Sequence, residues 1–188
     1  MSEQQTFSPK KWVLFNFIGW FLGVFAMLGI SSLLEAMGIK DMQVSVGAGM
    51  GLGIGLLQWW LLRTSVPVKF SWVWVSVFGM TLPFVVLELL SPLSGEQVLL
   101  PAVCIGAIIT GYVHFAILKP MLKKAILWLP ASSFGWLSAL AAVKLLDYTH
   151  LISTSNLVLF FVNLSLILSG GLLLGVSTAW ALNKMLKA

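Results

Sequence analysis

The sequence predicts an all-α membrane protein with six transmembrane helices, built as three parallel two-helix repeats around a pseudo-threefold axis. Three observations predict this fold class. The composition is too apolar for a soluble surface, six apolar runs are long enough to cross a bilayer, and two short motifs each recur along the chain.

The composition excludes a soluble protein. Of the 188 residues, 59% are hydrophobic and 9% are charged, and the mean hydropathy is +1.00. A soluble domain has about 25% charged residues, so this chain cannot cover a water-facing surface. The net charge of +5 does not indicate a nucleic-acid partner, because the cations stand at the ends of apolar runs. The single cysteine, Cys104, excludes an intrachain disulfide and a cysteine-cluster metal site.

Six apolar segments are long enough to span the hydrocarbon layer, which takes about 20 helical residues. They cover residues 12–34, 43–62, 70–90, 98–118, 126–147 and 155–182. Backbone polar groups need internal partners in lipid, so these segments are helices or strands of a closed barrel. Continuous apolar runs without period-2 alternation exclude the barrel. We expect one membrane domain over residues 1–188.

The basic residues predict the orientation. With six helices, nine Lys or Arg fall on one side of the membrane, and only Lys40 and Lys144 fall on the other. The nine are Lys10, Lys11, Arg63, Lys69, Lys119, Lys123, Lys124, Lys184 and Lys187. Positively charged residues mark the cytoplasmic side, so both termini are expected in the cytoplasm.

Two motifs indicate an internal repeat. The odd-numbered helices begin alike, as Trp12-x3-Asn16-x-Ile18-Gly19, Trp72-x3-Ser76-x-Phe78-Gly79 and Trp128-x3-Ser132-x-Phe134-Gly135. The even-numbered helices end alike, with Gln58, His114 and Thr178 at matching positions near a basic end. The repeats cover residues 10–64, 67–120 and 123–186. Each contains two helices, so all three insert the same way up and are expected to surround an axis along the membrane normal.

Small residues four apart recur in the even-numbered helices. They are Gly51 and Gly55, Ala107 and Gly111, and Gly171 and Gly175. Such residues let helix backbones approach closely in lipid, so we interpret all six as packing positions. A nucleotide-binding loop is disfavoured because no strand precedes the glycines and no phosphate-reaching lysine follows them.

Six polar side chains are expected at one depth below the cytoplasmic helix ends. They are Asn16, Gln58, Ser76, His114, Ser132 and Thr178. One interpretation is structural, with each hairpin clamped by a pair such as Asn16–Gln58 or Ser76–His114. The other is a polar vestibule or ligand site around the axis, with His114 as its titratable member. The clamp is favoured.

The tryptophans near the cytoplasmic helix ends are expected to form an aromatic belt at the lipid headgroups. They are Trp12, Trp72, Trp128, Trp59, Trp60 and Trp180. A pigment or quinone stacked on their rings is the alternative.

In the outer half of the membrane, Glu88 and Lys144 align between repeats and suggest an ion pair, with Asp147 competing for Lys144. One alternative to that pair is snorkelling of both charges to the interface. Another is a Glu88 buried in an apolar site, which stays protonated and relays protons.

The stretch Gly55-x2-Gln58-Trp59-x2-Leu62-Arg63 resembles a motif of small, uncharacterised bacterial multi-pass membrane proteins. That resemblance implies a bacterial cytoplasmic membrane and no particular activity. No motif of a catalytic triad, a metal site or a redox cysteine pair is present, so we expect no enzyme, cofactor or metal.

Two functions remain. One is a non-catalytic component that binds membrane lipid or another hydrophobic molecule, or that docks on a larger membrane complex. The other is a small-solute or ion transporter or channel with a path along the axis.

Overall fold

A computed structural model describes residues 7–40, 42–93, 95–151 and 155–188. In this part of the chain six long helices are α1 (Pro9–Ala36), α2 (Val44–Leu62), α3 (Ser71–Leu90), α4 (Glu96–Leu118), α5 (Trp128–Lys144) and α6 (Asn156–Leu186). Six helical segments are long and apolar enough to cross a membrane. The predicted multi-pass, all-α membrane protein is therefore confirmed, and the helix ends fall within about one turn of those expected.

The fifth segment differs from the expected single helix. The α-helix α5 is preceded by a 3-10 turn, η1 (Ala125–Leu127), and followed by a second one, η2 (Leu145–Leu151). The α-helical part therefore stops at Lys144, before the expected end at residue 147. Together η1, α5 and η2 still form a continuous apolar segment of 27 residues.

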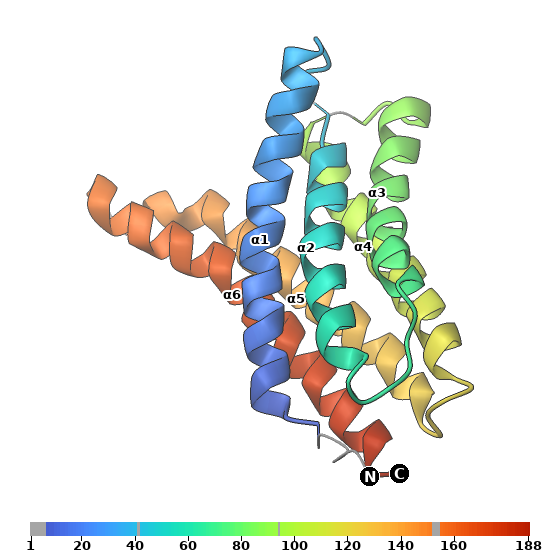
Figure 1. Cartoon of the computed structure of the whole chain (residues 1–188). Helices are drawn as coiled ribbons and strands as arrows, with labels where there is room; N and C mark the ends of the chain where they lie inside the picture. The colour runs from blue at the N-terminus through green and yellow to red at the C-terminus, as the bar shows by residue number, and fades with distance from the viewer. Residues whose placement is uncertain (1–6, 41, 94, 152–154) are drawn as a thin grey trace.

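The helices form a closed ring in chain order. Each helix packs against the next one in the sequence, and α6 returns to pack against α1 (Figure 1). The start of α1 and the end of α6 lie at the same end of this bundle. The first half of α6 diverges sideways from the bundle, and no residue from 156 to 169 is buried. Burial on α6 begins at Gly170, where the helix meets α1.

Glycines set the spacing between α1, α2 and α3. A Cβ atom added to Gly53 would lie on the backbone of Gly19 and Gly23, and one added to Gly51 would lie 2.5 Å from the carbonyl oxygen of Ser76. Helix α2 thus presents glycine to both neighbours, and close backbone contact is what favours helix association in lipid.

The six expected packing positions all lie at helix contacts or in the core. Gly51 and Gly55 meet α3, Ala107 is fully buried, Gly111 meets Leu129, and Gly171 and Gly175 meet α1.

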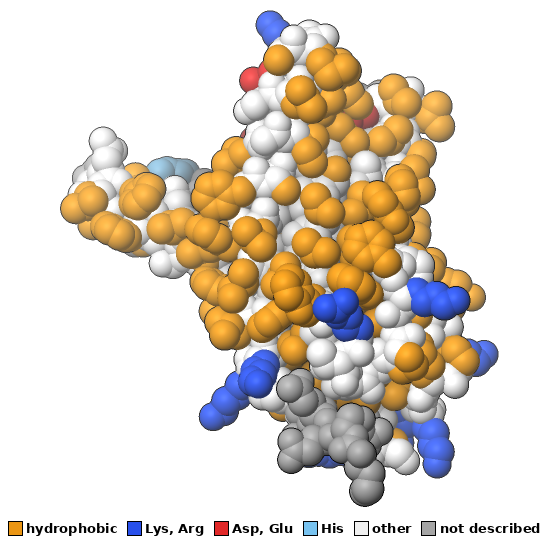
Figure 2. Space-filling model, in the orientation of Figure 1, with side chains coloured by type: hydrophobic (Ala, Val, Ile, Leu, Met, Phe, Trp, Pro, Cys, Tyr) orange, Lys and Arg blue, Asp and Glu red, His pale blue; other side chains and the backbone are white. Residues whose placement is uncertain are grey.

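Charge is unevenly distributed along the bundle. Lys and Arg side chains gather at the end where α1 begins and α6 ends, and a broad hydrophobic surface covers the middle (Figure 2). We call this the basic end. Because consecutive helices alternate in direction, the segments after α2 and α4 also lie there, as do the starts of α3 and α5.

Candidate functional site

Three fully buried tryptophans fill the centre of the ring near the basic end. Trp12, Trp72 and Trp128 come from the first turns of α1, α3 and α5, and each has an exposed fraction of 0%. The ring centroid of Trp128 lies 5.3 Å from that of Trp72 and 6.2 Å from that of Trp12. We call these residues the tryptophan cluster.

The predicted aromatic belt is therefore wrong for these three tryptophans. They face inward because burying three large indoles fills the centre of a six-helix ring better than small residues can. Trp60 and Trp180, by contrast, are 55% and 53% exposed, so a belt position stays a prediction for them. Trp59 is partly buried, with the guanidinium of Arg63 4.6 Å from its ring centroid.

Asn16 and Gln58 link α1, α2 and α3 beside this cluster. The Gln58 side-chain amide donates to Asn16 Oδ1 at 2.8 Å and accepts from the indole N–H of Trp72 at 3.4 Å. The Asn16 amide donates in turn to the carbonyl oxygen of Trp12 at 2.9 Å. Both side chains are buried, so these bonds satisfy groups that lipid cannot.

His114 lies flat against Trp72. The two rings are stacked, with centroids 3.6 Å apart and planes 2° apart. Its Nε2 lies 3.2 Å from the carbonyl oxygen of Trp72 and 3.3 Å from Ser76 Oγ. A carbonyl oxygen only accepts, so Nε2 carries the hydrogen in this arrangement. Ser76 Oγ also donates to the Trp72 carbonyl oxygen, at 3.1 Å. The imidazole is thus held by α3 on both its face and its edge.

Thr178 connects α6 to α1. It accepts from the indole N–H of Trp12 at 2.9 Å and donates to the carbonyl oxygen of Leu174 at 2.6 Å. Ser132 is buried on α5 but forms no hydrogen bond with another described residue of this network. Five of the six polar positions therefore join one hydrogen-bonded cluster around the tryptophans, and the sixth is buried one turn after Trp128.

The expected pair between Glu88 and Lys144 does not form. Lys144 makes its ion pair with Asp147 on the same segment, at 3.0 Å, and both side chains are solvent- or lipid-exposed. Glu88 Oε1 instead accepts a hydrogen bond from the backbone N–H of Gln43, the N-cap residue of α2. A free helix N-terminus attracts a carboxylate, and Asp147 is near enough in sequence to hold Lys144, so neither charge needs the other.

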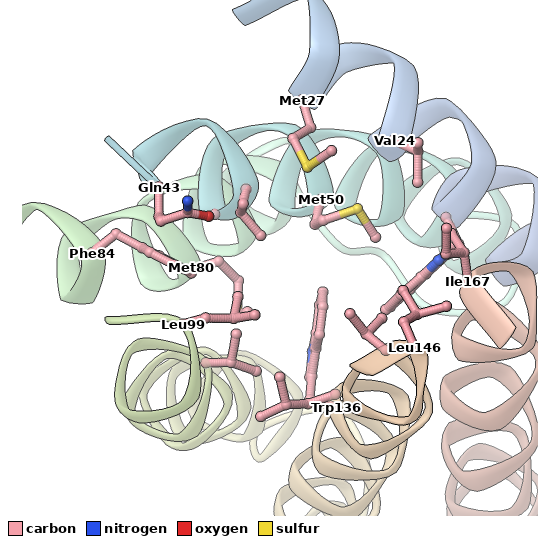
Figure 3. A pocket seen from close by; sticks show the side chains of 16 residues that line it. Val24, Met27, Gln43, Met50, Met80, Phe84, Leu99, Trp136, Leu146 and Ile167 are labelled. Carbon is pink, nitrogen blue, oxygen red and sulfur yellow. The ribbon is translucent and has the colours of Figure 1, made fainter. Parts of the chain in front are cut away.

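A cavity of about 230 Å³ lies in the centre of the ring, on the side of the tryptophan cluster away from the basic end (Figure 3). All six helices line it, with η2 and the N-cap of α2. The lining residues are Trp20, Val24, Met27, Gln43, Val46, Gly47, Met50, Met80, Phe84, Leu99, Val103, Trp136, Leu140, Val143, Leu146 and Ile167. Gln43 is the only one of these with a polar side chain other than indole.

Sequence reasoning missed this cavity, although a signal for it exists. Trp20, Met80 and Trp136 each stand eight residues after a member of the tryptophan cluster, and Val24, Phe84 and Leu140 each stand twelve after. Equivalent positions of the predicted repeats thus surround the space. Because all of them are apolar, a search for polar or ionisable residues passes over them.

The ring is filled between the cavity and the basic end. Next to the tryptophan cluster, Leu62, Leu118 and Leu182 stand at matching positions at the ends of α2, α4 and α6, and each is at most 1% exposed. The centre of the bundle therefore combines a packed, hydrogen-bonded half and a half with an apolar cavity. Comparison with protein-family models, curated proteins and solved structures finds no match to this chain.

Proposed function

We propose that this membrane protein is non-catalytic and binds a hydrophobic molecule in its central cavity. The observation that carries the proposal is that all six helices contribute apolar side chains to one space of about 230 Å³. An apolar cavity of about 150 Å³ in a soluble protein stays dry and binds benzene, so this one has room for a hydrocarbon chain or a small ring. Its walls resemble those of small-molecule sites, which are mostly apolar and aromatic.

The hydrogen-bonded cluster near the basic end has a structural role in this proposal. Asn16, Gln58, Ser76, His114 and Thr178 bond to one another, to the indoles or to backbone carbonyls. They tie α1, α2, α3, α4 and α6 together on the side of the cavity that faces the basic end. Transport along the axis, the alternative function, would require the tryptophan cluster and its leucines to separate.

The arrangement also supports the repeat and the orientation, which we retain as part of the proposal. Trp72 donates to Gln58 of the preceding hairpin, and Trp12 donates to Thr178 of the last hairpin, which are two of the three bonds that a pseudo-threefold relation implies. The third is not formed, because the indole N–H of Trp128 has no hydrogen-bond partner in the described part of the chain. The gathering of Lys and Arg at the basic end (Figure 2) supports cytoplasmic termini. The bacterial cytoplasmic membrane is retained as what the resemblance of the stretch from Gly55 to Arg63 implies.

Filling the cavity tests the proposed function. Val24 stands where the second repeat has Phe84, so Val24→Phe adds a ring to the wall without a polar group. We expect a hydrophobic molecule to co-purify with the wild-type protein at near-stoichiometric occupancy, and Val24→Phe to reduce that occupancy at least tenfold. The measurement is mass spectrometry of organic extracts from protein purified in a mild detergent.

The matched control is Leu22→Phe, on an exposed position of the same helix. It is expected to keep the wild-type occupancy. Ile167→Phe, which fills the cavity from α6, repeats the test if Val24→Phe lowers the yield of folded protein. Wild-type protein without a specifically retained molecule, or equal occupancy in the filled and control variants, would contradict the proposal.

A further inference from the structure

Two indole rings form one wall of the cavity. Trp20 of α1 and Trp136 of α5 have ring centroids 5.8 Å apart and planes inclined at 41°. Each is 5% exposed, and both line the cavity. The ring of Trp136 projects into the open space between the helices (Figure 3). The pair therefore presents aromatic surface to whatever occupies the cavity.

Both indole N–H groups lack a partner. Trp20 Nε1 is buried without a hydrogen bond. Trp136 Nε1 also forms no hydrogen bond with any other residue in the described part of the chain, although, unlike Trp20 Nε1, it is not fully buried. Trp12 and Trp72 differ, because their N–H groups bond to Thr178 and Gln58. Outside the cavity, the N–H groups of Trp59 and Trp128 are also buried without a partner among the described residues. A buried donor without a partner costs free energy, and each such group in a folded protein requires an explanation.

The chemistry of the wall restricts what can satisfy these donors. A buried water needs two to four polar partners and both gives and receives hydrogen bonds, but the two indoles offer donors only, and the amide of Gln43 is the one side-chain acceptor in the lining. A carbonyl oxygen accepts two hydrogen bonds and donates none, so it matches the wall. No lining residue is Lys, Arg, His, Asp or Glu, so a charged ligand would have no counter-charge.

We propose that the ligand is a neutral lipophile with a carbonyl oxygen, which accepts a hydrogen bond from Trp20 Nε1, Trp136 Nε1 or both. Its hydrocarbon part fills the space between Met50, Met80 and Phe84. This inference rests on the proposed function and adds the ligand's polar group. A fatty ester and a quinone share the required carbonyl chemistry.

The test compares matched probes on the full chain in lipid nanodiscs. Binding is measured as the rise in the thermal midpoint of unfolding as the mole fraction of probe in the lipid increases. One pair is methyl undecanoate and tridecane, and the other is 2,3-dimethyl-1,4-naphthoquinone and 2,3-dimethylnaphthalene. We expect at least one carbonyl probe to bind about tenfold more tightly than its hydrocarbon partner, which corresponds to one hydrogen bond. The pair that shows the preference identifies the source of the carbonyl.

The double variant Trp20→Phe/Trp136→Phe keeps aromatic rings and removes both donors. It is expected to lose the carbonyl preference while it still binds the hydrocarbons, and Trp180→Phe, on the exposed surface, is expected to keep the preference. Equal binding of carbonyl and hydrocarbon probes by the wild type, or a preference that survives the double variant, overturns the carbonyl proposal and leaves the proposed function standing. Failure of every probe to bind the wild type overturns both.

Discussion

Replacing Gly53 by alanine is expected to lower the free energy of unfolding by about 1–3 kcal/mol, the range for overpacking a tight contact. The added Cβ would lie on the backbone of Gly19 and Gly23 in α1, and backbone has little freedom to move aside. Separating α1 from α2 would also strain the hydrogen bond between Asn16 and Gln58. The measurement is equilibrium unfolding in mixed micelles, with the thermal midpoint as a second readout.

The same substitution at Gly29 is the control, because a Cβ there meets nothing within 4 Å. Alanine favours the helix over glycine by up to about 1 kcal/mol, so Gly29→Ala is expected to be neutral or slightly stabilising. Equal effects of the two substitutions would show that close packing of α1 on α2 does not hold the ring together.

The second large effect is expected from Trp72→Ala. Removing a buried indole costs about 3–5 kcal/mol through lost burial and the cavity left behind. Here it also removes the stacked partner of His114 and the indole donor to Gln58. We expect the variant to unfold at a much lower temperature, or to be recovered only in small amounts, and to lose the protection of α3 and α4 from hydrogen exchange.

Trp60→Ala serves as the control for this variant. Trp60 lies near the same end of the bundle but is 55% exposed, so its removal leaves no internal cavity and is expected to change stability by less than about 1 kcal/mol. A Trp72→Ala protein as stable as Trp60→Ala would contradict the description of the tryptophan cluster as the centre of the fold.

The transmembrane helices could be predicted from sequence because the bilayer imposes a length and an apolar composition on each of them. At α5 the expected helix type was also inaccurate, because the chain continues as a 3-10 turn after Lys144. Apolar composition is the same for both helix types, so hydropathy alone cannot distinguish them.

The positions of Trp12, Trp72 and Trp128 show what single-helix reasoning misses. A tryptophan in the first turn of a helix suits the headgroup region and the centre of a helix ring equally well by composition. Whether it lies at the headgroups or in the centre depends on which face of the helix points inward. In a nearly all-apolar helix, the sequence does not distinguish that face from the others. Recurrence at the same place in each motif was the available signal, since a belt requires no such register.

The predicted contact between Asn16 and Gln58 forms, whereas the predicted pair between Glu88 and Lys144 does not, and the difference has a physical cause. Lipid offers no hydrogen-bond partners, so Asn16 and Gln58 had to face inward, and facing inward at one depth brought them together. Glu88 and Lys144 stand near helix ends, where a helix N-terminus and a nearby carboxylate were closer partners. Sequence alignment between repeats cannot rank such local alternatives.

The most direct test is an experimental density map of the protein purified with its native lipids. We expect one continuous density in the cavity, lying against the ring of Trp136 and bounded on the basic side by the packed indoles of Trp12, Trp72 and Trp128. A cavity that is empty, or that α6 closes by moving inward, would contradict hydrophobic-ligand binding. A water-filled passage past the three indoles would support the transport alternative instead.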